Sequence, residues 1–128
     1  MVNGIEIVSV PVADVDNAKS FYRDVLGPIE IADVVVPGGM RWVQLAPPAG
    51  GPSITLTTWF PTMPAGSLRG LVLRVDTVEA AAERLSALVI GCPSGIEQAP
   101  RGRFLQIEDP DGNGLILREP AVPTQPTP

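Results

Sequence analysis

Residues 12–18, Val12-Ala13-Asp14-Val15-Asp16-Asn17-Ala18, recur as residues 75–81, Val75-Asp76-Thr77-Val78-Glu79-Ala80-Ala81, in the second half of the chain. The two stretches match in residue type at four places at one constant offset (75 − 12 = 63). A strand-like apolar run precedes each copy, and a helical pattern that ends in glycine follows it. Self-similarity of this kind is the mark of a repeated supersecondary unit. The stretch therefore predicts one strand and helix pair, present twice.

Two later matches extend the repeat beyond the helix. Residues 42–45, Trp-Val-Gln-Leu, match residues 104–107, Phe-Leu-Gln-Ile, in type at every position (104 − 42 = 62). The apolar runs at 53–56 and 114–117 align in the same way (114 − 53 = 61). Three near-equal offsets in the same order indicate a duplication whose copies differ by single-residue insertions or deletions.

The local signals fill in the remaining elements of each copy. Asp14 or Asp16 can cap a helix that runs to about Val25 and stops at Gly27, while Thr77 can cap a second helix over 77–88. Alternating and β-branched runs predict strands at 5–12, 29–36, 40–45, 53–59, 68–75, 103–108 and 114–118, with an irregular strand around residue 96. The segment 61–66 reads as the linker between the copies, and 109–113 as the last turn, formed by Asp109 and Asp111.

Composition excludes several classes of function. The chain has 128 residues, 45% of them hydrophobic, which is enough for one domain with a proper core. Its net charge of −5, with scattered arginines and one lysine, disfavours nucleic acid as a partner. No apolar run approaches the ~18 residues of a membrane span, and the single Cys92 forms no internal disulfide, so we expect a cytoplasmic protein. Residues 120–128 are rich in proline and are expected to form a disordered tail.

Two stretches carry a resemblance to a known superfamily. Residues 10–27, VPVADVDNAKSFYRDVLG, and residues 109–114, DPDGNG, resemble the glyoxalase, bleomycin-resistance and extradiol-dioxygenase superfamily, also called vicinal oxygen chelate proteins. The resemblance implies an α+β fold of two tandem βαβββ modules, about 3–60 and 67–119, within one domain over 1–119. Their curled mixed sheets would enclose a cleft, and the protein would be a homodimer.

The resemblance also implies where a metal would bind, and the residues there are unsuitable. Metal-using members place ligands on the first and last strands of each module, and the matching positions here are Ile7, Thr55, Gly70 and Ile116. Transition metals prefer imidazole, thiolate or carboxylate ligands, and the chain has no histidine. We therefore expect neither a metal nor another cofactor, which disfavours glyoxalase and dioxygenase chemistry.

Strand alternation predicts the lining of the cleft. If the four matching positions face inward, so do their neighbours two residues away, and the resemblance adds the equivalent pairs at 42, 44, 104 and 106. The candidate ligand-binding residues are Ser9, Trp42, Gln44, Thr55, Thr57, Trp59, Arg74, Phe104, Gln106 and Arg118. Apolar walls with a few polar groups are typical of a small-molecule pocket, although aromatic residues of this kind also pack in cores, and the arginines can pair with Asp76 and Glu119.

Three functions remain open from the sequence. The first is metal-free binding of a small hydrophobic or aromatic compound in the cleft, a sequestration like that of bleomycin-resistance proteins. The second is a metal-independent isomerase or lyase of secondary metabolism, for which Tyr22, Glu6, Glu108 and Glu119 are the candidate acid–base groups. The third is a structural module that binds no ligand. Net acidity favours a cationic ligand, whereas the two inward arginines favour an anionic one.

Overall fold

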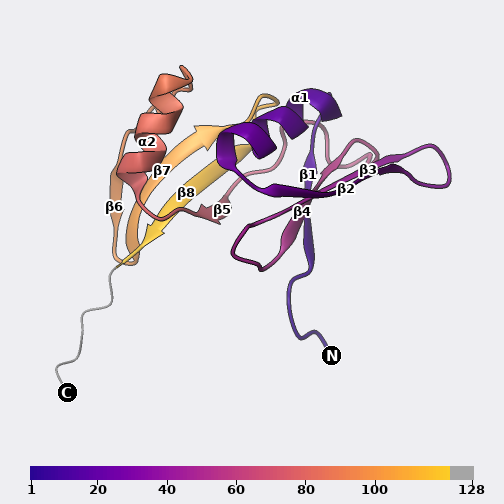
Figure 1. Ribbon diagram of the computed structural model, residues 1–128, viewed down its shortest axis with the longest axis horizontal. Helices are drawn as coiled ribbons and strands as arrows, with labels where there is room; N and C mark the ends of the chain where they lie inside the picture. The colour runs from indigo at the N-terminus through magenta and orange to yellow at the C-terminus, as the bar shows by residue number, and fades with distance from the viewer. Residues whose placement is uncertain (122–128) are drawn as a thin grey trace. The chain divides into compact units, whose positions relative to one another are not determined.

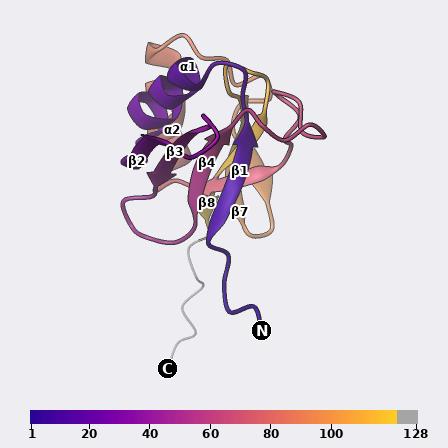
Figure 2. The same ribbon diagram turned by 90° about the vertical axis from the view of Figure 1, so that its right-hand side faces the viewer.

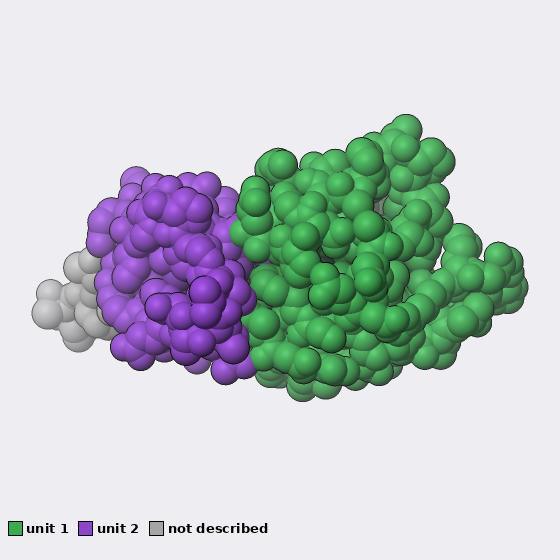
Figure 3. Space-filling view, turned by 90° about the horizontal axis from the view of Figure 1, so that it is seen from above, with its two compact units in different colours: residues 1–69, 108–113 green, residues 70–107, 114–128 purple. Residues whose placement is uncertain are grey.

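The computed structural model describes residues 1–121, so residues 122–128 of the predicted tail lie outside the described residues. The chain forms two compact units (Figure 3). Unit 1 comprises Met1–Arg69 together with Glu108–Asn113, and unit 2 comprises Gly70–Ile107 together with residues 114–121. The last turn of the second repeat therefore belongs to the unit built from the first repeat.

Unit 1 holds a four-stranded mixed sheet with a helix across one face (Figure 1). Its elements are β1 (Ile7–Pro11), α1 (Val15–Ser20), η1 (Phe21–Leu26), β2 (Ile29–Val35), β3 (Arg41–Ala46) and β4 (Ser53–Thr57). The strand order is β1-β4-β3-β2. The strand β1 runs parallel to β4, beside which it lies in Figure 2, and the other neighbours are antiparallel. A β-bulge interrupts the β2–β3 pairing between Glu30 and Ala32.

The predicted helix of the first repeat forms with the expected start and end. Asp14 is its N-cap, and its Oδ1 accepts a hydrogen bond from the Asn17 amide at 3.1 Å. From Phe21 onward the coil widens to the π-helical segment η1, and Gly27 ends it with a φ of +96°, a conformation that glycine adopts without strain. The wider turn places Phe21 and Tyr22 side by side against the sheet, where both are buried.

The core of unit 1 lies between this helix and the sheet. Its fully buried side chains come from alternate positions of β1, β3 and β4 and from the inner side of the helix: Val10, Val43, Leu45, Leu56, Ala18 and Tyr22. Burial of side chains of this size contributes about 1.5–3 kcal/mol each. The sheet therefore has one face that the helix covers and one face that the helix leaves free.

Unit 2 repeats the arrangement with shorter strands. Its elements are β5 (Leu71–Arg74), α2 (Val78–Ala87), β6 (Glu97–Ala99), β7 (Gly102–Glu108) and β8 (Gly114–Pro120), in the order β5-β8-β7-β6. Thr77 caps α2, because its hydroxyl accepts from the Ala80 amide at 3.2 Å. The helix covers the face that buries Leu105, Ile107, Leu115 and Leu117. Two βαβββ modules with mixed sheets are thus confirmed.

Several boundaries differ from the sequence-based prediction. The strand expected at 68–75 is confined to β5, because Gly70 has a φ of +79° and the Leu68 amide donates to Asn113 Oδ1 instead of to a sheet neighbour. The strand expected at 53–59 ends at Thr57. Pro120, assigned to the disordered tail, is the last residue of β8, and the amide after it donates to Arg101 O at 2.8 Å.

Candidate functional site

The free face of the unit 1 sheet collects six of the ten predicted ligand-binding residues. Ser9, Thr55 and Gln44 are register partners across β1, β4 and β3, so they form one row. Thr57 and Trp42 lie one step further along the same strands, and Trp59 follows β4. Because side chains alternate across a strand, these residues share the side opposite α1.

Aromatic side chains form the largest surface on this face. Trp42 and Trp59 are half-buried and stack with ring centroids 6.3 Å apart and an interplanar angle of 24°. Phe60, which is 42% exposed, continues the cluster with its centroid 6.0 Å from that of Trp59. The Trp42 indole Nε1 donates to Gln44 Oε1 at 3.2 Å, which orients both side chains. The three rings present an open apolar platform bordered by an amide.

The two predicted threonines of this face are buried. Thr55 is 1% exposed and Thr57 is 2% exposed. The Thr55 hydroxyl is 3.4 Å from that of Ser9, and the Thr57 hydroxyl donates to Val10 O at 3.4 Å. Both threonines therefore support the face, while Ser9 and Gln44 are its accessible polar groups.

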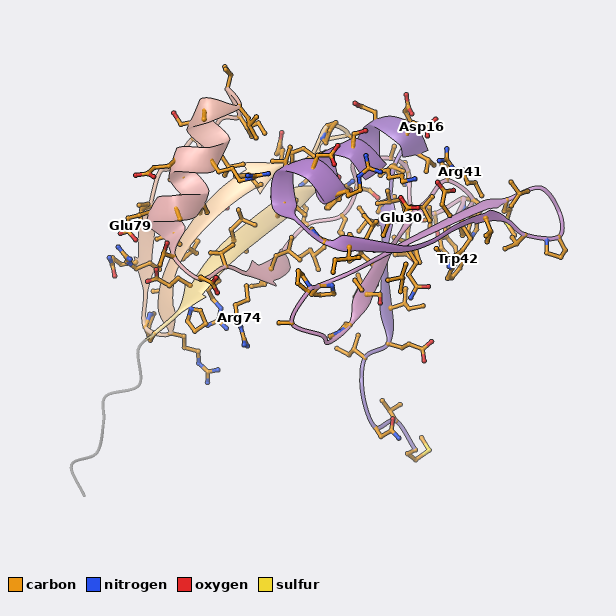
Figure 4. All side chains as sticks on the ribbon, in the orientation of Figure 1. Asp16, Glu30, Arg41, Trp42, Arg74 and Glu79 are labelled. Atoms are coloured by element: carbon orange, nitrogen blue, oxygen red, sulfur yellow. The ribbon has the colours of Figure 1, made fainter. Side chains whose placement is uncertain are left out.

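The covered side of the same sheet has an ionic network that ties α1 to β2 and β3. Asp33 accepts from Lys19 at 2.6 Å and from Arg41 at 2.8 Å, and Arg41 also reaches Asp16 at 2.8 Å. Hydrogen bonds from Arg41 and Lys19 hold the pKa of Asp33 below its usual range. Figure 4 shows Arg41 on the helix side of the sheet and Trp42 on the other side. The adjacent residues Arg41 and Trp42 of β3 thus point to opposite faces of the sheet: Arg41 joins the ion pairs beneath the helix, and Trp42 lies on the free face.

The free face of the unit 2 sheet holds the other four predicted residues. Arg74 and Arg118 are register partners on the parallel strands β5 and β8, and Phe104 and Gln106 lie on β7. Arg74 and Gln106 are exposed, and Phe104 and Arg118 are half-buried. Gln106 Nε2 donates to Glu97 Oε2 at 2.8 Å. Each repeat thus supplies one open face that combines an aromatic side chain with polar groups.

The candidate acid–base groups are mostly engaged elsewhere. Tyr22 is fully buried and its hydroxyl donates to Asp109 Oδ2 at 2.7 Å, while burial, and then that hydrogen bond, raise its pKa. Glu119 accepts from Arg103 and from the Val78 amide, so it closes the N-terminus of α2. Glu6 and Glu108 are exposed at strand ends. Neither Tyr22 nor Glu119 is available to a substrate on a free face.

A family of known proteins matches most of this chain. The sequence model described as the glyoxalase/bleomycin resistance protein/dioxygenase superfamily matches residues 4–117. The chain belongs to this superfamily.

Solved structures agree with that membership. TnmS3, described as an antibiotic binding protein from Streptomyces sp. CB03234, is 41% identical, with a TM-score of 0.84 over 94% of this chain and 98% of that one. A glyoxalase/bleomycin resistance protein from the same organism is also 41% identical, with a TM-score of 0.80 over 91% and 100%. A superfamily member from Sphaerobacter thermophilus DSM 20745 shares the fold at 24% identity, with a TM-score of 0.83 over 92% and 98%. The curated proteins give no match to this sequence.

The four positions that correspond to the superfamily's metal ligands do not fit a metal ion. Ile7 and Ile116 have hydrocarbon side chains, Gly70 has none, and the Thr55 hydroxyl is buried next to Ser9. Within residues 1–121, no three His, Cys, Asp or Glu side chains are grouped so that they could hold a metal. None of the helices in this part of the chain is long and apolar enough to cross a membrane.

Sequence reasoning missed two residues on the free faces. Phe60 lies just after the end of β4, so strand alternation could not place it, although its position beside Trp59 was a signal. Glu97 lies on β6, a strand of only three residues that the sequence predicts poorly. It is the register partner of Phe104, so the unit 2 face has a carboxylate, whereas none of the predicted ligand-binding residues is acidic.

Proposed function

We propose that this protein binds a planar hydrophobic or aromatic compound reversibly and without a metal ion, and so sequesters it. The observation that carries the proposal is the stacked pair Trp42 and Trp59 on the free face of unit 1. Two large rings that stay half-exposed in a chain with only 5% aromatic residues leave considerable apolar area in contact with water. A flat ligand that stacked on them would bury this area.

The polar groups on the same face suit such a ligand. Gln44 is held by Trp42 through its carbonyl oxygen, so its amide N–H groups are free to donate to a ligand carbonyl or hydroxyl. Ser9 offers a half-buried hydroxyl. Apolar walls with a few polar groups that orient the ligand are the usual composition of a small-molecule site.

The similar structures support the same class of ligand. TnmS3, at 41% identity over nearly its whole length, is described as an antibiotic binding protein. We propose by this likeness that the bound compound is an antibiotic or a related polycyclic metabolite. Binding would need no metal, because the ligand positions of the superfamily carry hydrocarbon, hydroxyl or no side chain.

We further propose that the protein is a cytoplasmic homodimer. The edge strand β2 exposes a row of apolar side chains, among them Ile31 at 53% and Val34 at 52%. Exposed apolar edge strands are sites of association between chains. Sedimentation velocity should show a dimer that Ile31→Lys converts to a monomer. A monomeric wild type at micromolar concentration would contradict this part of the proposal.

The binding proposal is tested by titrating chelator-treated protein with a panel of polycyclic aromatic antibiotics. Both tryptophans of the chain lie in the proposed site, so intrinsic fluorescence reports it directly. Saturable quenching is expected from at least one compound, and calorimetry should give the same Kd. Trp42→Phe and Trp59→Phe should each weaken binding, whereas Val35→Ala, on the helix side of the same sheet, should not.

Two results would contradict the proposal. One is the absence of quenching and of heat with every compound of the panel. The other is binding that arises only after Ni²⁺ or Zn²⁺ is added, since this would show a metal-dependent site.

A further inference from the structure

We infer that the free face of unit 2 is itself a binding surface for an anionic group, and that the compounds this protein binds include organic acids with a flat apolar body. This inference rests on the proposed function, because it names the chemistry of the compound bound. It is carried by Arg74 and Arg118, which lie directly opposite each other on adjacent parallel strands.

Arg74 and Arg118 project from the same face of adjacent strands as a pair of like charges. Neighbouring strands are about 4.8 Å apart, and partners in register project to the same face. Like charges opposite each other in a sheet are destabilising. Within residues 1–121 no carboxylate oxygen forms an ion pair with either arginine, and the one hydrogen bond of Arg118 goes to Arg101 O at 3.2 Å.

Two other arginines of the chain, by contrast, have carboxylate partners. Arg41 lies between Asp16 and Asp33, and Arg103 is held by Glu79 and Glu119. Those two arginines neutralise acidic groups beside a helix. In a chain with a net charge of −5, carboxylates are plentiful, yet none within residues 1–121 forms an ion pair with Arg74 or Arg118.

The surroundings of the pair suit an amphipathic anion. The hairpin that joins β7 and β8 is closed by the hydrogen bond from Asp109 N to Asn113 O. In an antiparallel hairpin, each step back along one strand is matched by one step forward along the other. Five steps from the closing pair therefore place Phe104 opposite Arg118 (109 − 5 = 104 and 113 + 5 = 118). The next row contains Val72 and Ile116, which are register partners. A ring could therefore contact Phe104 and the aliphatic side chains while its acidic group reached the arginines.

Glu97, the carboxylate in the same row as Phe104 and Arg118, does not pair with the arginines. Glu97 is the register partner of Phe104 on β6, and it accepts from Gln106 Nε2. Phe104 thus separates Glu97 from Arg118. Because arginine presents several N–H donors in one plane, two adjacent guanidiniums match the two oxygens of a carboxylate. The geometry therefore favours an anionic ligand over the cationic one that the net charge alone suggests.

The test compares 2-naphthoate with the neutral 2-naphthamide, which has nearly the same shape. Backbone amide shifts of Val72 and Phe104 report unit 2, and tryptophan fluorescence reports unit 1. We expect naphthoate to bind at least about tenfold more tightly than naphthamide, with a difference that shrinks as salt is added. Arg74→Gln and Arg118→Gln should each remove most of the difference. Arg23→Gln, which lowers the net charge equally but breaks an exposed pair with Asp24 in unit 1, should not.

The outcomes separate this inference from the proposed function. Equal binding of the two compounds, or a preference for naphthoate that survives Arg118→Gln, overturns the anion site. If the anion site is overturned but naphthamide quenches the tryptophans, the proposed binding of aromatic compounds by Trp42 and Trp59 is still supported. Shifts in unit 2 with naphthoate alone, without quenching, support the anion site and count against the tryptophan platform. A response from neither compound counts against both.

Discussion

The Tyr22 hydroxyl donates a hydrogen bond to Asp109 Oδ2 at 2.7 Å across 87 residues of chain. It joins the helix of the first repeat to the last turn of the second, inside unit 1. Asn113 completes the junction, because its Nδ2 donates to Pro11 O and to Asp109 Oδ2, and its Oδ1 accepts from the Leu68 amide. Asp109 and Asn113 are both buried, so these bonds are protected from water. The loop that the sequence marks as a turn is therefore also a link between the repeats.

Tyr22→Phe tests the strength of this link. It removes the hydroxyl and leaves the ring in place, so packing is kept. Asp109 Oδ2 retains the bond from Asn113 Nδ2, and we therefore expect a loss of only about 1 kcal/mol in the free energy of unfolding. Urea unfolding followed by circular dichroism measures it. An unchanged midpoint would show that the hydrogen bond contributes nothing to stability.

Alkaline pH should unfold the protein through the same residue. Burial, and then the hydrogen bond to Asp109, raise the pKa of Tyr22 in the folded state. Because the pKa is higher in the folded state, the neutral Tyr22 side chain makes its full contribution to stability below the unfolded-state pKa of about 10. That contribution is lost progressively as the pH rises above about 10. Tyr22 is the only tyrosine. Tyrosinate absorbance should therefore appear only together with unfolding, and Tyr22→Phe should be less sensitive to pH above about 10. Ionisation in the folded state at pH 10 would contradict this.

Two glycines with nearly the same backbone angle should respond differently to alanine. Gly66 has a φ of +81° and Gly70 a φ of +79°, so both substitutions introduce similar backbone strain of about 1 kcal/mol. At Gly66 the new Cβ would lie 2.1 Å from Asp111 O, whereas at Gly70 nothing lies within 4 Å. We expect Gly66→Ala to destabilise the protein by at least about 2 kcal/mol more than Gly70→Ala, measured by thermal unfolding. Equal effects would show that the chain relaxes around Gly66.

Trp59→Ala should weaken ligand binding without unfolding the protein. The side chain lies beyond the end of β4, and its ring contacts within residues 1–121 are with Trp42 and Phe60. Loss of one stacking surface should cost about 1–2 kcal/mol, which is about tenfold in Kd. Calorimetry measures this without relying on the removed fluorophore. Unchanged affinity for a compound that quenches the wild type would mean that the quenching is indirect.

Much of the fold could be predicted because the signals are local. Asp14 and Thr77 cap the two helices as expected, since a cap needs only a side chain three residues from its amide partner. Alternation along β1 and β4 placed Ser9 and Thr57 on the same face as Thr55, and the register Ser9↔Thr55 agrees, because register partners share a face by geometry. The errors fall where a distant partner decides. The strand expected from residue 68 is shortened because the Leu68 amide bonds to Asn113, 45 residues away.

The properties of the candidate site likewise fall into those that the sequence predicts and those that depend on distant partners. The sequence by itself determined the duplication, the superfamily and the unsuitable residues at the metal-ligand positions, since these depend only on residue type and spacing. Only the tertiary structure decided that Thr55 and Thr57 are buried, that Phe60 extends the tryptophan pair, and that Arg74 lies opposite Arg118 with no ion pair to a carboxylate within residues 1–121. Exposure, ring stacking and charge pairing depend on segments far apart in the chain, and no local pattern encodes their distances.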